Sequence, residues 1–307
     1  LTLTEDLVKK EQGIILEEAS MYKDNPNRVL SEKIKENVFV NDPYRNKVIG
    51  TDEDIKRIAK EELETCYNSF YSPNNMFIIS IGNFDPKMAL EIIKENTKNF
   101  QNKNQKIEKI YKNEPDHVYK KYENIEFNID NTKIAVAYKI NKNALKDLKI
   151  TNFELDLYLN ALLNMGLGLT SEIREKWLKQ KLFTSSFYKI IETESHYVIE
   201  FDAISEKPDE LEKELDDYLK DIKINKEDFE RQKKSWIASE VKTISNINSI
   251  LYSILDDVLD YEKFIPNKIE IIKKLDFDKL KEIKEKIIFN TKSTVKMTPK
   301  LNRNIVK

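Results

Sequence analysis

Two glutamates seven residues apart, Glu11 and Glu18, are the residues whose type and spacing best suit chemistry. On a helix this spacing places them on one stripe, two turns apart. Glu17 and Glu18 also interrupt an apolar stretch, with residues 13–16 before them and 19–21 after them. A carboxylate in apolar surroundings is costly unless a cation, a metal or hydrogen bonds compensate it. The spacing alone is equally typical of a solvated helix face, so it leaves a metal site and a surface pair both open.

The chain has few histidine and cysteine residues that could serve as further metal ligands. It has two histidines, His117 and His196, and neither has a second histidine four residues away. One lies in a polar stretch and the other in a hairpin-like connection, so both are expected at the surface. The single cysteine, Cys66, excludes an intrachain disulfide framework and a cysteine zinc cluster. A single cysteine fits a reducing compartment, and we expect a cytoplasmic location.

Length and composition indicate a folded chain of about two domains. The chain has 307 residues, of which 40% are hydrophobic, enough to bury a core. Its 52 lysines and arginines balance 54 aspartates and glutamates, for a net charge of -2. Without a basic excess to meet a phosphate backbone, nucleic acid is not an expected partner. No apolar run approaches the roughly 18 residues of a transmembrane helix, so no membrane span is expected.

The elements that would position the glutamates are predicted to be helices and short strands. Apolar spacing predicts a helix through both glutamates that ends before Asn25-Pro26, where proline disfavours continuation. Thr51, with Asp54 three residues later, is predicted to open a helix that runs to about Tyr67. The other elements predicted in the first hundred residues are a helix over 28–38, a strand over MFIISIG (76–82) and a helix that begins at Asp85-Pro86.

Residues 99–121 are polar and lysine-rich, which predicts a surface linker. Beyond the linker, strands in hairpins and helices in separate blocks favour α+β domains with antiparallel sheets over a doubly wound parallel sheet. The strands are predicted within 126–140 and over 182–191, 196–204 and 293–297, and the helices over 153–165, 171–181, 208–221, 226–244, 247–259 and 276–287.

The glutamate segment resembles a known family. E-x-G-I-I-L-E-E (11–18), followed by M-Y-x-D-N-P (21–26), is similar to the segment that carries the third zinc ligand in insulinase-type (M16) zinc metallopeptidases, and within them to the bacterial YmfH-like group. The similarity continues through residues 42–86, with an F-Y-x-P-x-N-M turn and a strand ending in Gly-Asn. It extends more weakly to 167–187 and 224–246, which resemble blocks of the family's second homologous domain.

This resemblance implies an α+β chain of two homologous M16 (LuxS/metallohydrolase-like) domains, the first incomplete. Residues 1–100 would be the C-terminal part of the metal-bearing domain, 101–122 the linker, and 123–307 the second, inactive-type domain. By position Glu18 matches the zinc-ligating glutamate and Glu11 the supporting carboxylate of the same helix, whereas Glu17 falls where the family varies.

The family's other two zinc ligands and its general base come from an H-x-x-E-H helix, an inverted zincin motif. The resemblance places that motif before Leu1, so no catalytic residue is expected in this chain. We expect zinc in the intact protein and none bound by this chain. The family's substrate-holding arginine and tyrosine also lack matches. The arginine position falls on Leu178 and the tyrosine position near Phe183 or Thr184, while Arg174 and Tyr188 are out of register.

Two functions follow from the resemblance. The first is a zinc-dependent metalloendopeptidase that hydrolyses peptides, inactive as this fragment. The alternative is a non-catalytic M16-like subunit, a scaffold or peptide clamp for an active partner. A third possibility is a pair of α+β domains that shares ancestry with the family but not its function. The expected partners are a peptide substrate and another M16-type chain, in a homodimer or heterodimer.

Overall fold

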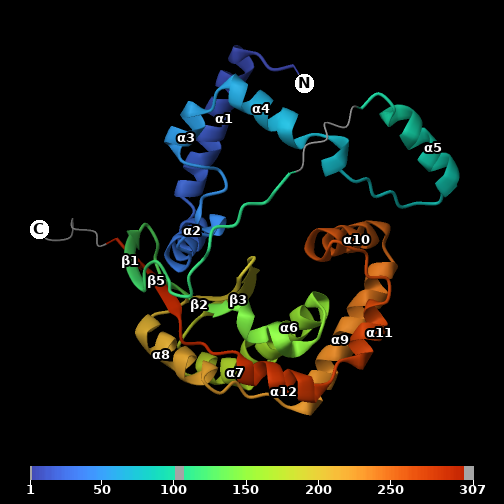
Figure 1. The fold of residues 1–307 in the computed structure, drawn as a ribbon. Coiled ribbons are helices and arrows are strands. Elements are labelled where there is room, and N and C mark those ends of the chain that lie inside the picture. Colours follow the sequence, from blue (N-terminus) through green and yellow to red (C-terminus); the bar gives the residue numbers. More distant parts are fainter. Residues whose placement is uncertain (1, 101–106, 301–307) are drawn as a thin grey trace, which may run out of the picture. The chain divides into compact units, whose positions relative to one another are not determined.

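The computed structural model describes residues 2–100 and 107–300 (Figure 1). Contacts within the chain define two compact units, each made of three segments. The first unit comprises Leu1–Glu17, Thr51–Ile110 and Ser235–Glu270, and the second comprises Glu18–Gly50, Tyr111–Lys234 and Ile271–Lys307. This division follows contacts and not ancestry, so the domain boundaries drawn from the family resemblance remain a prediction.

The second unit is built on one five-stranded sheet with the order β1-β5-β2-β4-β3. β1 pairs with β5 in parallel, and the other three pairs are antiparallel. The predicted hairpin of β3 and β4 is confirmed, but β1 and β2 are not neighbours, because the last strand of the chain lies between them. The strands are β1 (Tyr122–Phe127), β2 (Lys133–Asn141), β3 (Ser185–Glu192), β4 (His196–Ile204) and β5 (Lys292–Pro299).

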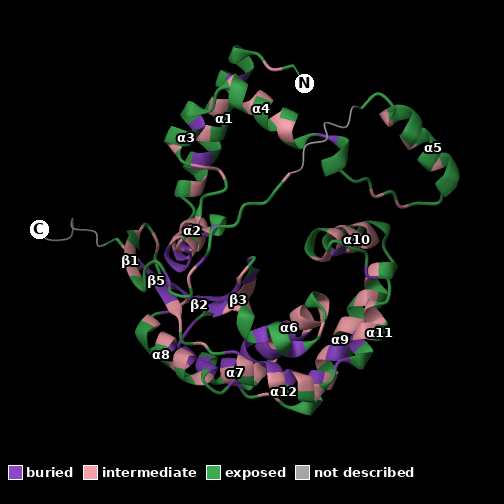
Figure 2. Ribbon diagram, viewed as in Figure 1, coloured by how far each residue is buried: buried purple, intermediate pink, exposed green. Residues whose placement is uncertain are grey.

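Helix α2 (Pro26–Val38) packs on one face of this sheet. Side chains alternate across a strand, so Ala135 and Ala137 of β2 share the face that meets Leu30 and Ile34 of the helix. Every residue of β2 between its two ends is buried, as expected of a central strand that is covered on both faces. The buried residues concentrate in this sheet and its covering helices (Figure 2).

Helices cover the opposite face of the sheet. Tyr138 on β2 donates a hydrogen bond of 2.7 Å to Asp216 on α8, and Trp177 on α7 packs edge to face against Phe201 of β4. Trp177 is only 1% exposed and belongs to the core of the second unit. The helices of this group are α6 (Asn152–Leu167), α7 (Glu172–Lys179), α8 (Pro208–Leu219) and α12 (Phe277–Lys286), with the short 3-10 helix η3 (Lys142–Leu148) before them.

The helix predicted from Thr51 to Tyr67 is two helices, α3 (Asp52–Arg57) and α4 (Lys60–Phe70). The capping box at Thr51 is confirmed, but Ala59 adopts an extended conformation and a second cap starts there, with Glu62 accepting from its N–H. The Gln12 side chain donates to the carbonyls of Lys56 (3.2 Å) and Ile58 (2.8 Å) at the end of α3. A side chain 44 residues away in sequence therefore stabilises the break.

The prediction of a strand over MFIISIG (76–82) is wrong. Residues 76–82 have no regular structure, and Met76, Phe77 and Ile78 are each more than half exposed. A strand needs a neighbour for its N–H and C=O groups, and no described residue pairs with this segment. The cap at Asp85 is confirmed, since its side chain accepts from the Lys87 N–H at the start of α5 (Pro86–Thr97).

The remaining helices lie late in the chain. α9 (Lys226–Ile244) and α10 (Ile247–Tyr261) were predicted, whereas α11 (Lys268–Lys274) was not. Two short 3-10 helices, η1 (Pro43–Arg45) and η2 (Pro73–Asn75), lie earlier. Of the helices described, none combines the length and the apolar character needed to cross a membrane.

The polar segment before β1 is more than a linker. Residues 101–106 lie outside the described part, but Glu114 and Val118 are buried in the second unit. The Glu114 carboxylate accepts from the N–H groups of Val40 (2.9 Å), Asn41 (2.6 Å) and Asp42 (2.8 Å) and pairs with Lys139 of β2. These contacts hold the end of the segment against the chain after α2.

Candidate functional site

The candidate site is carried by helix α1 (Glu5–Lys23). The helix starts after Thr4, whose hydroxyl accepts from the Leu7 N–H at 3.3 Å. Glu5 and Asp6 in its first turn and Lys23 in its last turn suit the helix dipole. The helix ends where predicted, because the Asn25 side chain accepts from the first N–H groups of α2.

Glu11 and Glu18 are both solvent-exposed on α1, as is Glu17. Seven residues of helix separate Glu11 from Glu18, which corresponds to roughly 10 Å along the axis. The neighbouring Ile14 and Ile15 are 48% and 37% exposed. Because the carboxylates remain in contact with solvent, their desolvation cost is small. Burial among apolar side chains therefore gives no reason to expect a bound cation here.

Glu18 has a defined neighbour on its own helix. The Tyr22 hydroxyl, one turn further along, donates a hydrogen bond to Oε1 of Glu18. This hydrogen bond and the negative charge of Glu18 raise the pKa of Tyr22. The Arg28 guanidinium lies 4.7 Å from the centre of the Tyr22 ring. The Tyr22 hydroxyl thus fixes the orientation of the Glu18 carboxylate. A hydrogen-bonding neighbour of this kind commonly supports a carboxylate that binds a metal.

The described residues do not complete the zinc site that the M16 resemblance implies. A catalytic zinc takes three protein ligands and leaves a fourth position open. Among the described residues, no group of three or more His, Cys, Asp or Glu side chains is placed to hold a metal ion. Glu18 could supply one ligand, but this chain does not assemble the set, and no reaction step can be built from it alone.

The two histidines differ from one another. His117 is exposed, as predicted, but His196 is only 1% exposed, so the prediction of a surface residue is wrong. Its ring nitrogens are engaged on both sides, Nδ1 with the Ser195 hydroxyl at 2.8 Å and Nε2 with Asp116 at 3.0 Å. Because these bonds satisfy the buried ring, His196 anchors the segment before β1 to the sheet.

Arg174 and Tyr188 have structural partners. The Arg174 guanidinium is buried and donates to the hydroxyl and the carbonyl of Ser186 on β3, while the Tyr188 hydroxyl donates to Asn164 on α6. Burial raises the pKa of Tyr188 to about 12, so its hydroxyl stays protonated. Both side chains therefore have hydrogen-bond partners within the fold. This agrees with assigning neither residue to substrate binding.

The family model of the peptidase M16 inactive domain matches residues 57–235 of the chain. The chain belongs to the M16 peptidase family. It is 30% identical over 223 residues to the uncharacterized zinc protease YmfH of Bacillus subtilis, a match that covers 70% of this chain and 50% of YmfH. It is 29% identical over 91 residues to an uncharacterized zinc protease of Rickettsia bellii, covering 30% of this chain and 21% of that protein. The M16 chain thus spans at most about half the length of these relatives.

Solved structures confirm the fold. An M16-like peptidase from Alicyclobacillus acidocaldarius matches with a TM-score of 0.84 and 21% identity over 97% of this chain and 72% of that one. A protease from Helicobacter pylori matches with a TM-score of 0.81 and 18% identity over 97% of this chain and 73% of that one. The α+β fold expected from the M16 resemblance is therefore established.

Two groups of buried charges were missed by sequence reasoning. One is the Glu114–Lys139 pair, whose members are 25 residues apart and whose segment looked uniformly polar. The other is Glu200 and Asp202 on β4. The second group did leave a signal, because two acidic residues at alternate positions of an apolar strand must share one face.

Proposed function

We propose that the intact protein is a zinc-dependent metalloendopeptidase of the M16 type that hydrolyses peptides. In this proposal Glu18 is one of the zinc ligands and Glu11 a supporting carboxylate on the same helix. The remaining ligands and the general base come from residues outside this chain. We further propose a cytoplasmic location and assembly with another M16-type chain, as a homodimer or a heterodimer.

The presentation of Glu18 is the observation that carries the proposal. Its carboxylate is exposed on a well-capped helix, it is oriented by Tyr22, and it lies in the segment that resembles the family's third zinc ligand. A ligating carboxylate needs both access and a neighbour that fixes its orientation. Membership of the M16 family, with relatives named as zinc proteases, supports the same assignment.

Peptide cleavage by the intact gene product tests the proposal. A quenched fluorescent peptide library should be cut by the intact protein, and a zinc chelator should abolish the cleavage. Glu18→Gln should lower kcat/KM at least 100-fold, because the amide is a neutral and weaker ligand. The neighbouring Glu17→Gln, also exposed but off the stripe, is the matched control and should keep wild-type activity. Full activity in Glu18→Gln would remove Glu18 from the site.

The alternative function is a non-catalytic subunit that clamps peptides for an active partner. The family model that matches describes the inactive domain, and no described residue group is placed to hold a metal. Under this alternative the intact protein binds peptides without cutting them, and cleavage appears only when a second M16-type chain is added.

A further inference from the structure

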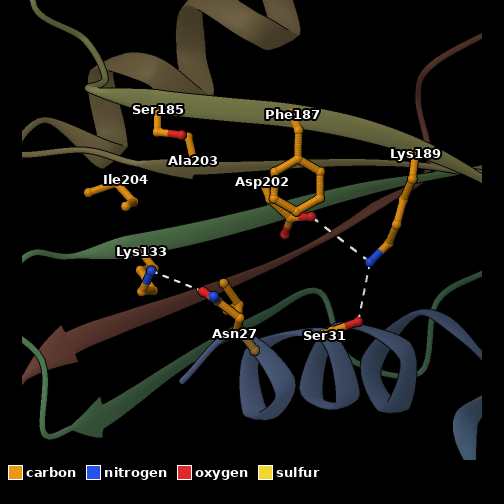
Figure 3. Close-up of a pocket in the computed structure, with 10 residues that line it drawn as sticks. Asn27, Ser31, Lys133, Ser185, Phe187, Lys189, Asp202, Ala203 and Ile204 are labelled. Atoms are coloured by element: carbon orange, nitrogen blue, oxygen red, sulfur yellow. Dashed lines mark hydrogen bonds and ion pairs between the residues drawn. The ribbon is translucent and has the colours of Figure 1, made fainter. Parts of the chain in front are cut away.

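A pocket of about 180 Å³ lies within the second unit, between α2 and the strands β3 and β4 (Figure 3). Leu30 of α2, Phe187 of β3 and Ile204 of β4 contribute its apolar walls. For scale, an engineered protein cavity of about 150 Å³ holds a benzene molecule. The pocket thus has room for a ligand with a stem of roughly four carbon atoms.

Two carboxylates form the polar end of this pocket. Asp202 lines it, and Glu200 lies two residues earlier on β4 and on the same face of the strand. Both are buried, with exposures of 7% for Asp202 and 0% for Glu200. Lys189 of β3 lies 2.7 Å from Glu200, 4.0 Å from Oδ2 of Asp202 and 3.2 Å from the Ser31 hydroxyl of α2. The Lys189 ammonium therefore forms its closer ion pair with Glu200 and a longer one with Asp202.

Asp202 is left with an unused acceptor. Its Oδ2 atom is buried and, like both carboxylate oxygens of Glu200, has no N–H or O–H donor among the described residues within hydrogen-bonding geometry. Such an atom costs free energy unless a donor reaches it. Figure 3 shows Asp202 and Lys189 at the pocket, joined by the long ion pair, and Lys133 hydrogen-bonded to Asn27, which also lines the pocket. A donor that enters the pocket can complete the coordination of Oδ2.

The charges around Asp202 make its protonation state adjustable. Burial and the negative charge of Glu200 raise the pKa of Asp202 to about 8, against the opposing effect of Lys189. The groups that face the pair are Lys189 from β3, Lys133 from β2 and Lys35 from α2. Burial raises the pKa of Glu200 as well, so at neutral pH the pair of carboxyls holds a proton, which an entering cation can replace.

The chemistry of the pocket favours an organic cation over a metal ion. Calcium and magnesium require about six oxygen ligands, whereas the unpaired oxygens at the polar end of this pocket belong to only two carboxylates, Asp202 and Glu200, beside apolar walls. An ammonium group supplies three N–H donors and a positive charge, and its aliphatic stem can lie against the walls. We propose that this pocket binds a primary ammonium group on a short aliphatic stem, with Asp202 as its counter-ion. On binding, Asp202 loses its proton to solvent and the ammonium takes its place, so charge and protons balance.

This ligand chemistry has two sources, the lysine side chain of a peptide and a free alkylamine. Isothermal titration calorimetry with n-butylammonium, with acetyl-Gly-Lys-Gly-amide and with its norleucine analogue separates them. Tighter binding of the lysine peptide than of n-butylammonium assigns the pocket to peptides, and the reverse assigns it to free amines. The norleucine peptide, which lacks the ammonium, should bind at least tenfold more weakly than the lysine peptide. The proposal does not depend on zinc chemistry.

The pH dependence gives the sharpest test. Since a pKa of about 8 leaves Asp202 mostly protonated at pH 6.5, affinity for n-butylammonium should rise roughly 20-fold between pH 6.5 and 8.5. Close to one proton should be released per ligand bound at pH 6.5, measured in buffers of different ionisation enthalpy. An anion such as butyrate should show the opposite dependence, so tighter binding of butyrate than of n-butylammonium at pH 6.5 would overturn the proposal.

Variants complete the test on the whole chain. Asp202→Asn keeps the shape of the side chain and should weaken n-butylammonium binding at least tenfold and remove the pH dependence. Phe187→Ala shortens an apolar wall whose residue is 57% exposed, so the fold should survive; binding should weaken while the pH dependence stays. Asp147→Asn, at an exposed position on η3, is the matched control and should bind as wild type. Unchanged binding in Asp202→Asn, or no binding of n-butylammonium at 50 mM, would contradict the proposal.

Discussion

The buried pair of Glu114 and Lys139 predicts a large loss of stability when one partner is removed. The two side chains are 2% and 0% exposed, respectively. Among the described residues, Glu114→Ala would leave the Lys139 ammonium with two hydrogen-bond acceptors, the carbonyls of Val38 (3.3 Å) and His117 (3.1 Å). Removing one member of a buried pair typically costs about 3–5 kcal/mol, because the other charge is stranded. The N–H groups of residues 40–42 also lose their acceptor.

Urea unfolding followed by tryptophan fluorescence measures this loss. The chain has two tryptophans, and a Trp236→Phe background leaves Trp177, which is buried in the second unit, as the reporter. Glu114→Ala should lower the free energy of unfolding by about 3–5 kcal/mol. The double variant Glu114→Ala/Lys139→Met should recover at least about 2 kcal/mol of it, since no charge is then stranded.

An exposed ion pair and the dependence on pH provide the controls for this prediction. Asp217→Ala removes an exposed ion pair with Lys220 on α8 and should change stability by less than about 1 kcal/mol. Burial raises the pKa of Glu114, but the hydrogen bonds from Lys139 and the backbone outweigh it and leave the pKa lowered. The contribution of Glu114 is therefore complete above its ordinary pKa and lost as pH falls through the lowered value. A Glu114→Ala variant within 1 kcal/mol of wild type at pH 7, or a double variant no better than the single one, would refute the account.

Two further predictions concern the two ends of α3. Thr51→Ala removes half of the capping box and should destabilise the first unit by about 1 kcal/mol, while Thr51→Ser should not. Gln12→Leu removes both side-chain bonds to the end of α3, so amide hydrogen exchange in α3 should accelerate while exchange in the β2 strand stays unchanged; equal protection in the variant would show that these bonds do not hold the helix end.

Local signals in the sequence gave the helices and their caps. Thr51 with Asp54, and Asp85 before Pro86, predict helix starts because the capping atoms lie within three residues of the helix they cap. Glu18 could be singled out by its resemblance to the family's ligand segment, and the structure adds the neighbour Tyr22 that orients it.

Non-local contacts account for what sequence reasoning missed. The place of β5 between β1 and β2 depends on pairing across about half the chain, which no short pattern encodes. The apolar segment 76–82 has the composition of a strand, but the described residues offer it no partner. The Asp202 pocket was missed because its walls come from α2 and from strands more than 150 residues further along.

Zinc stoichiometry of the intact gene product tests the central claim most directly. Plasma mass spectrometry after dialysis against a weak chelator should find one zinc per wild-type chain and one in the Glu17→Gln control. The Glu18→Gln variant should retain less than a tenth of that, because loss of one of three protein ligands leaves the metal weakly held. One tightly bound zinc per chain in Glu18→Gln would contradict the assignment of Glu18 as a ligand.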